Sequence, residues 1–130
     1  MPALTEAQAQ LLLDPNFAVV AVVRPDGTPQ TSVVWIDWDG EDAIFTTKPE
    51  RAKTRLLEAN PHVNLIVVDM QDPYRYVEIE GTATLDFDEA RAAAHIHEMS
   101  HKYRGVPYPH PEGRNLVRVR PERVHPYGVE

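Results

Sequence analysis

The sequence predicts a mainly β domain: an antiparallel barrel of six strands with a few helices on its outside. Six short segments rich in β-branched residues are joined mostly by tight turns, one of which contains Asp26-Gly27. The segment 77–87 alternates apolar and polar side chains along its whole length, with Gly81 midway, where a barrel strand bends. The 130 residues, of which 42% are hydrophobic, suit a single domain over residues 1–130 that buries one core.

Each element has boundary signals of its own. Thr5 is the expected N-cap of the opening helix, and Glu6 follows in its first turn. Pro49 is expected to open the second helix, and Pro61 marks its end. In chain order we expect helix 4–13, strands 17–23, 30–38 and 43–47, helix 49–60, strands 63–69 and 77–87, helix 88–104 and strand 115–124.

The second strand, residues 30–38, is apolar on both faces. Val33 and Trp35 lie on one face, and Val34, Ile36 and Trp38 lie on the other. A barrel strand with one face in water should be polar on that face. The extra apolar face therefore predicts a second cover, which a homodimer interface, a bound aromatic ligand or a helix of the same chain would supply.

The composition excludes several classes of function. The formal net charge of −7 argues against a nucleic acid or an anionic membrane surface as a partner. No apolar run is long enough to span a membrane, and the first residues lack the basic start of a signal peptide. The absence of cysteine excludes thiol chemistry and disulfides, so we expect a cytoplasmic protein.

Residues 97–101 read His-Glu-Met-Ser-His and match H-E-x-x-H, in which two histidines one helical turn apart hold zinc. On the predicted helix, the apolar stripe that faces the core consists of Ala92, Ile96, Met99 and Tyr103. His97 and His101 lie on the opposite side, toward solvent, and no third ligand follows at the spacing of a zinc protease. We therefore expect neither zinc catalysis nor a metal site.

A cluster of positive charge interrupts this acidic chain, because Arg51, Lys53 and Arg55 fall within five residues. The cluster lies where a predicted strand gives way to a predicted helix, and free backbone amides at a helix start attract anions. Hydroxyl groups lie beside it in the sequence, on Thr46, Thr47 and Thr54. Such a set can hold a phosphate through charge-assisted hydrogen bonds; the alternative is a basic helix that only aids solubility.

Four stretches of the chain together resemble one known superfamily. They read "RPDGTPQTSVVWIDWDG", "TTKPERAKTRLLEANPHVNLIV", "DPYRYVEIEGTATL" and "RVRPERVHPYG". The chain is similar over residues 11–128 to the pyridoxamine 5'-phosphate oxidase-like split β-barrel superfamily. Within it, the chain resembles the branch that uses the deazaflavin coenzyme F420.

The resemblance implies a six-stranded split barrel that forms a homodimer, with two cofactor sites at the interface. It implies that Arg51 and Lys53 bind the cofactor phosphate, with Thr54 beside them and the strand-end residues Thr46 and Thr47 lining the pocket. The second strand would run along the cofactor ring and would place four residues near it: Gln30, Ser32, Val34 and Trp35. The partner's C-terminal "HPYG" would complete the site.

The function implied by the resemblance is hydride transfer between reduced F420 and a small organic acceptor. The sequence has no nucleophile elbow, no phosphate-binding loop of the Walker type and no recognisable acid–base pair, so a bound cofactor must supply the chemistry. Two alternatives remain open: an oxidoreductase of the same barrel family that uses flavin mononucleotide (FMN), and a non-catalytic protein that binds a flavin, F420 or haem.

Overall fold

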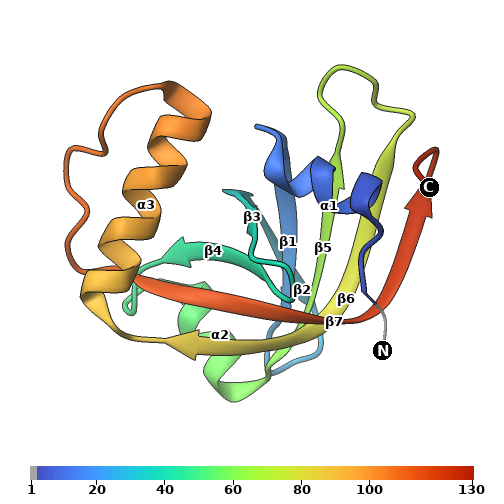
Figure 1. Ribbon diagram of the computed structural model, residues 1–130. Helices are drawn as coiled ribbons and strands as arrows, with labels where there is room; N and C mark the ends of the chain where they lie inside the picture. Colours follow the sequence, from blue (N-terminus) through green and yellow to red (C-terminus); the bar gives the residue numbers. More distant parts are fainter. Residues whose placement is uncertain (1–2) are drawn as a thin grey trace.

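The computed structural model describes residues 3–130, so the first two residues of the predicted domain 1–130 lie outside the described part. All of its strands form one antiparallel sheet in the order β2-β1-β5-β6-β7-β4-β3, which curls into a half-barrel (Figure 1). The predicted class, a mainly β split barrel with a few helices, is confirmed. In chain order the elements are α1 (Glu6–Leu13), β1 (Phe17–Val23), β2 (Pro29–Trp35), β3 (Asp37–Trp38), β4 (Ala43–Thr47), α2 (Ala52–Ala59), β5 (His62–Val68), β6 (Tyr76–Asp86), α3 (Glu89–Arg104) and β7 (Asn115–Tyr127).

The sheet has seven strands because the predicted strand 30–38 is divided at Ile36. Strand β2 pairs with β1, whereas β3 pairs with β4, so these two consecutive strands form the opposite edges of the sheet. Only Ile36 separates Trp35 from Asp37, and two peptide units span no more than about 7 Å. The two edges must therefore meet at this residue. We call this meeting line, from β2 through Ile36 to β3 and β4, the seam.

Inward-facing residues of the strands alternate with outward-facing ones, as the sequence pattern predicts. Along β6, Val77, Ile79 and Gly81 are buried, and the side chains between them are half-buried. The alternation of this strand is therefore confirmed, except that Phe87 lies beyond the strand end and is 50% exposed. Helix α1 closes the core with Leu11 and Leu12.

Gly81 lies at a shift of register between β6 and β7. A Cβ atom at this position would collide with the backbone carbonyl of Arg120 on β7. The missing side chain thus lets the two long strands approach closely where they bend. Strand β7 continues to Tyr127, three residues beyond the predicted end at Val124, because its ladder with β6 resumes after the shift.

The helix boundaries agree with the sequence prediction at α1 and differ from it at α2. Thr5 caps α1 in a capping box with Gln8. The prediction that Pro49 opens the second helix is wrong: the helix begins at Ala52, and Arg51 is its N-cap residue. Pro49 instead lies in a turn that is closed by the Arg51 N–H donating to the carbonyl of Lys48 at 2.9 Å.

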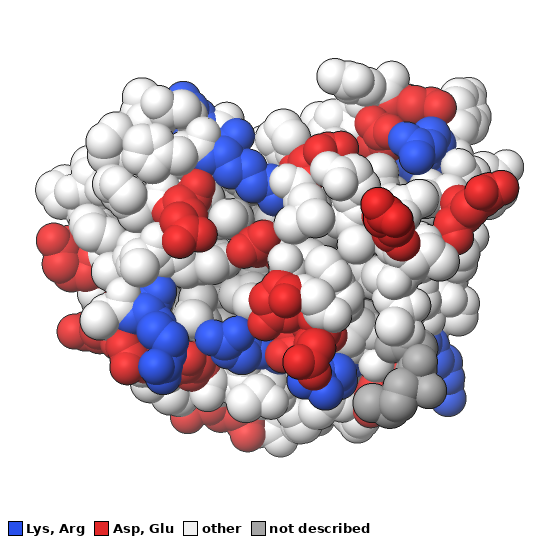
Figure 2. Space-filling view, viewed as in Figure 1, with Lys and Arg blue, Asp and Glu red and all other residues white. Residues whose placement is uncertain are grey.

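The surface carries charges of both signs and a partly exposed apolar sheet face. Acidic and basic side chains are interspersed on the side that Figure 2 shows. On the outer face of β1 and β2, Val33 is 65% exposed and Val19, opposite it in the ladder, is 38% exposed. No helix within residues 3–130 combines the length and the apolar character that crossing a bilayer requires.

Candidate functional site

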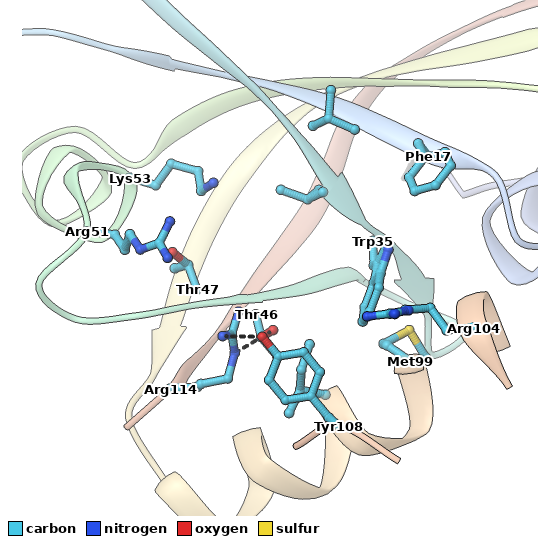
Figure 3. A pocket seen from close by; sticks show the side chains of 13 residues that line it. Phe17, Trp35, Thr46, Thr47, Arg51, Lys53, Met99, Arg104, Tyr108 and Arg114 are labelled. Carbon is cyan, nitrogen blue, oxygen red and sulfur yellow. Dashed lines mark hydrogen bonds between the residues drawn. The ribbon is translucent and has the colours of Figure 1, made fainter. Parts of the chain in front are cut away.

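A pocket with a volume of about 390 Å³ opens along the seam. Strands β2 and β4 form its floor, the start of α2 borders one end, and α3 with the loop that follows it covers the other side (Figure 3). The residues that line it are Phe17, Val33, Val34, Trp35, Thr46, Thr47, Arg51, Lys53, Ile96, Met99, Arg104, Tyr108 and Arg114.

Three cationic side chains converge at the α2 end of the pocket: Arg51, Lys53 and Arg114. Burial lowers the pKa of Lys53, and the nearby Arg51 and Arg114 lower it further. Burial is also the main cause of the lowered pKa of Arg114. Within residues 3–130 none of the three forms an ion pair with a carboxylate. Like charges held together in this way favour an anionic ligand.

Hydrogen bonds fix two of these cations in place. The Lys53 Nζ donates to the Ser32 Oγ on β2 at 3.0 Å. The Arg114 Nε donates to the Thr46 Oγ1 at 3.2 Å, and its guanidinium also contacts Tyr108, with the Nη1 3.4 Å from the hydroxyl. The cationic end is therefore assembled from α2, β2, β4 and the segment that precedes β7.

The opposite end of the pocket is flat and largely apolar, apart from the Arg104 side chain beside Trp35 and Met99 (Figure 3). The Trp35 ring stacks on the Tyr103 ring, with centroids 5.3 Å apart and planes 6° from parallel. Tyr108 meets the same indole edge-on at 6.2 Å. Met99 of α3 and Val34 of β2 add aliphatic surface. Such walls suit a planar ring system, which gains from burial and from stacking on aromatic faces.

The structure brings six of the nine predicted site residues to the pocket wall: Val34, Trp35, Thr46, Thr47, Arg51 and Lys53. Ser32 joins them through its hydrogen bond to Lys53. Thr54 is fully buried, and its hydroxyl lies 3.0 Å from the Lys48 carbonyl and 3.2 Å from the Asn115 Oδ1. It thus supports the turn between β4 and α2 rather than facing the pocket. Gln30 is half-buried on β2 and is not among the lining residues.

The sequence prediction missed the residues that come from α3 and from the proline-rich loop after it. Arg114 and Tyr108 have no periodic pattern around them that would place them. Arg114 is placed at the pocket by tertiary pairing. It immediately precedes β7, and β7 pairs with β4 so that Asn115 lies opposite Thr47. A basic residue just before this strand must therefore lie close to the strand end that carries Thr46 and Thr47.

The two histidines of the H-E-x-x-H match are both exposed on α3, as the helical periodicity predicts. Their Nε2 atoms lie 3.4 Å apart. Across residues 3–130, no group of three or more histidine, aspartate or glutamate side chains is arranged to hold a metal ion. His95, on the flank of the same helix, instead lies 3.1 Å from the Asp37 carboxylate at the seam.

The curled sheet and the pocket in its seam are those of a split β-barrel. The chain belongs to the pyridoxamine 5'-phosphate oxidase family, whose sequence profile matches residues 4–128. The superfamily resemblance seen in the sequence is confirmed by this match.

Three similar proteins illustrate the relationship. A solved structure named F420 reductase is 35% identical, superposes with a TM-score of 0.83, and covers 94% of this chain and 98% of its own. A pyridoxine/pyridoxamine 5'-phosphate oxidase of Rubrobacter xylanophilus is 28% identical over 92% of this chain and 68% of its own length. Another oxidase of that name, from Myxococcus xanthus, is 30% identical over 91% of this chain and 71% of its own. The likeness to the F420 reductase supports the F420 branch.

Proposed function

We propose that the protein is an oxidoreductase that transfers hydride between reduced coenzyme F420 and a small organic acceptor. The observation that carries the proposal is the pocket itself, with three cations at one end and a flat aromatic wall at the other. A phosphate-bearing tricyclic cofactor has the same two-part character. The 35% identity with a structure named F420 reductase, over 98% of that chain, supports deazaflavin as the cofactor.

The donor set fits the phosphate of such a cofactor. Arg51, Lys53 and Arg114 would bind the anion, and the hydroxyls of Thr46 and Thr47 lie at the same end. Thr54 would act one step away, because its hydroxyl holds the turn from which Arg51 projects. Binding the phosphate neutralises the mutual repulsion of the three cations and so favours the loaded protein.

The ring would lie along β2. Val34 and Trp35 would provide its wall, and Ser32 would keep the Lys53 ammonium in place for the phosphate. We place Gln30 at the far end of the same strand, within reach of a longer cofactor or a partner subunit. Deazaflavin, when bound, supplies hydride transfer without one-electron chemistry. The protein's own contribution is to orient the ring, to exclude water and to position the acceptor.

We further propose that the protein acts as a homodimer with cofactor sites at the interface. The exposed Val33 lies both on the pocket rim and on the uncovered outer face of β2, so a second subunit on this face would also border the pocket. Helix α3 of the same chain covers Trp35 through Tyr103 but leaves Val33 open. The partner's C-terminal residues 125–128 would contribute to the site. A cytoplasmic location agrees with the absence of cysteine.

The second candidate is an FMN-dependent oxidoreductase on the same barrel. Two relatives, which match 92% and 91% of this chain, are named pyridoxine/pyridoxamine 5'-phosphate oxidases. Parallel titrations of the purified protein with F420, FMN and haem distinguish the candidates. Tighter binding of F420, with reduction of an acceptor by reduced F420, is the expected result. Tighter binding of FMN selects the second candidate. Binding of haem alone, without reductase activity, identifies a non-catalytic binding protein and overturns both.

A further inference from the structure

The seam is closed by side chains of α3 rather than by a strand ladder. Ile36 belongs to neither β2 nor β3, so its backbone groups lack the ladder partners of a strand residue. Its N–H donates to the Tyr103 Oη at 3.0 Å, and its carbonyl accepts from the Lys102 Nζ at 2.6 Å. Ile36 is itself fully buried. A buried backbone group without a hydrogen-bond partner costs free energy. Lys102 and Tyr103 therefore supply the partners that Ile36 lacks because it lies between two strands.

The same two side chains also reach the last turn of α1 and the residues that follow it. The Lys102 Nζ donates to the Leu12 carbonyl at 2.6 Å, and the Tyr103 hydroxyl donates to the Asn16 carbonyl. One turn of α3 therefore joins three parts of the chain at the seam. We call Lys102 and Tyr103 the α3 clasp.

The clasp is directly coupled to the pocket. Trp35, the residue before Ile36, lines the pocket and stacks on the Tyr103 ring. Ile96 and Met99, on the same helix as the clasp, form another part of the pocket wall. The hydrogen bonds to Ile36 and the stacking on Trp35 thus fix backbone and side chain at adjacent positions. The cationic end of the pocket, in contrast, rests on α2, β4, Arg114 and the Ser32 hydroxyl of β2, and its hydrogen bonds run to these groups rather than to the clasp.

We propose that Lys102 and Tyr103 are positioning residues: by holding the Ile36 backbone, they fix the width of the seam and aim the Trp35 ring at the ligand. The identity of the ligand rests on the proposed function, whereas the action on the seam does not. If the clasp were purely structural, its removal would lower the stability of the whole barrel and weaken binding at both ends of the pocket alike. If it is a positioning clasp, its removal weakens binding of the ring and leaves binding of the anion at the far end unchanged.

The test uses Lys102→Met and Tyr103→Phe, which remove the ammonium and the hydroxyl, and His101→Ala as a matched control on the exposed side of the same helical turn. Three probes are titrated: the deazaflavin nucleoside without its phosphate, riboflavin, and inorganic phosphate. Amide exchange at Ile36 and the indole N–H signal of Trp35, assigned with Trp35→Phe, are followed by NMR spectroscopy.

In Lys102→Met we expect ring binding to weaken about tenfold, the scale of one hydrogen bond to a charged group. The Trp35 signal should shift, and exchange at the Ile36 amide should accelerate most in Tyr103→Phe, which removes the hydroxyl that accepts from this amide. Inorganic phosphate should bind all three variants as it binds the parent. Tyr103→Phe should act in the same direction, and His101→Ala should match the parent throughout.

Two results would overturn the inference: equal weakening of ring and phosphate in the clasp variants, or Ile36 exchange and a Trp35 signal that stay as in the parent. If the parent binds phosphate but neither ring compound, the proposed function fails. The exchange at Ile36 and the Trp35 signal then decide the clasp by themselves, so the two failures are distinguishable.

Discussion

The Lys53 ammonium on α2 lies 3.0 Å from the Ser32 hydroxyl on β2, so one hydrogen bond ties the basic helix to an edge of the sheet across the pocket floor. Lys53 is half-buried, whereas Arg55, two residues later on the same helix, is exposed and does not line the pocket. Two basic residues of one cluster thus have different environments, which gives a matched pair for mutation.

Lys53→Ala is expected to weaken binding of F420 and FMN by about 1.5–3 kcal/mol, the scale of a hydrogen bond to a charged group. Arg55→Ala should leave the affinity unchanged, because its side chain lies outside the pocket. Fluorescence titration of both variants measures the difference. The reverse ranking of the two variants would contradict the assignment of the anion site.

Arg114→Ala should weaken cofactor binding on the same scale, about 1.5–3 kcal/mol, although this residue lies far from the basic cluster in the sequence. Its guanidinium is held toward the anion end by the Thr46 hydroxyl. The control is Arg118→Ala, which removes an arginine paired with Asp39 and Asp86 instead. Isothermal titration with FMN and with riboflavin separates the effects, since only FMN carries the phosphate. An equal loss for both ligands would argue against a phosphate contact.

The free energy of unfolding of the double variant His97→Ala, His101→Ala is expected to lie within about 0.5 kcal/mol of the parent's value, as is usual for substitutions of exposed residues. Both side chains are exposed, and their hydrogen bond is to each other rather than to the barrel. Chemical denaturation gives the free energy, and elemental analysis of both proteins gives the metal content. Loss of a stoichiometric zinc ion, or of reductase activity, would show that the histidines do more.

Val33→Glu should convert the proposed dimer to monomers at micromolar concentration while the barrel still folds. Val33 is 65% exposed in the single chain, so a charge there costs the monomer little, whereas burial against a partner would be strongly unfavourable. Light scattering measures the mass, and circular dichroism checks the fold. Thr31→Glu, an exposed position on the same strand nearer the hairpin, provides a second site on this face. A monomeric parent would refute the shared-site arrangement.

The stability of the parent relative to Lys102→Met is expected to rise as the pH increases from 8 to 10.5. Burial lowers the pKa of Lys102 from 10.5 to about 8, and the nearby Asp37 and Asp14 offset this only in part. Between these values the unfolded chain holds a proton that the folded protein has released, so raising the pH favours the folded state. Below pH 8 both states are protonated, and the difference should be flat. Melting temperatures of both proteins across this range measure the slope.

Local pattern predicts most of this fold because strand pairing and burial leave a period of two in the sequence. The six expected strands, the helix cap at Thr5 and the exposed histidines of α3 all depend on neighbours within a few residues. The division of residues 30–38 does not: whether Trp38 continues β2 or pairs with β4 depends on where the far edge of the sheet lies. No local pattern in the sequence encodes the position of that edge.

The start of α2 and the place of Arg114 were unpredictable for related reasons. Proline is common in the first turn of a helix and also in turns, so Pro49 alone does not fix where the helix begins. Here the Thr54 hydroxyl lies within hydrogen-bond distance of the Lys48 carbonyl and of the Asn115 side chain, which is far away in the sequence. Arg114 reaches the pocket through the pairing of β7 with β4, which joins segments about 70 residues apart. The candidate site is thus half local, in residues 46–54, and half a product of tertiary pairing.

Because Ile36 joins the two edges of one sheet, the barrel is closed covalently where other barrels are closed by a ladder. Helix α1 lies beside the last residue of the chain, since the Gln8 side chain donates to the Glu130 carbonyl at 3.4 Å. A circular permutant with joined natural ends and new ends at residues 36 and 37 would keep every strand pairing. In that chain no covalent link would join the two edges, and side-chain contacts, such as those of α3 and the hydrogen bond of Lys53 to Ser32, would resist opening of the sheet. The permutant would convert a rigid closure into a hinge, and the pocket into a cleft of adjustable width.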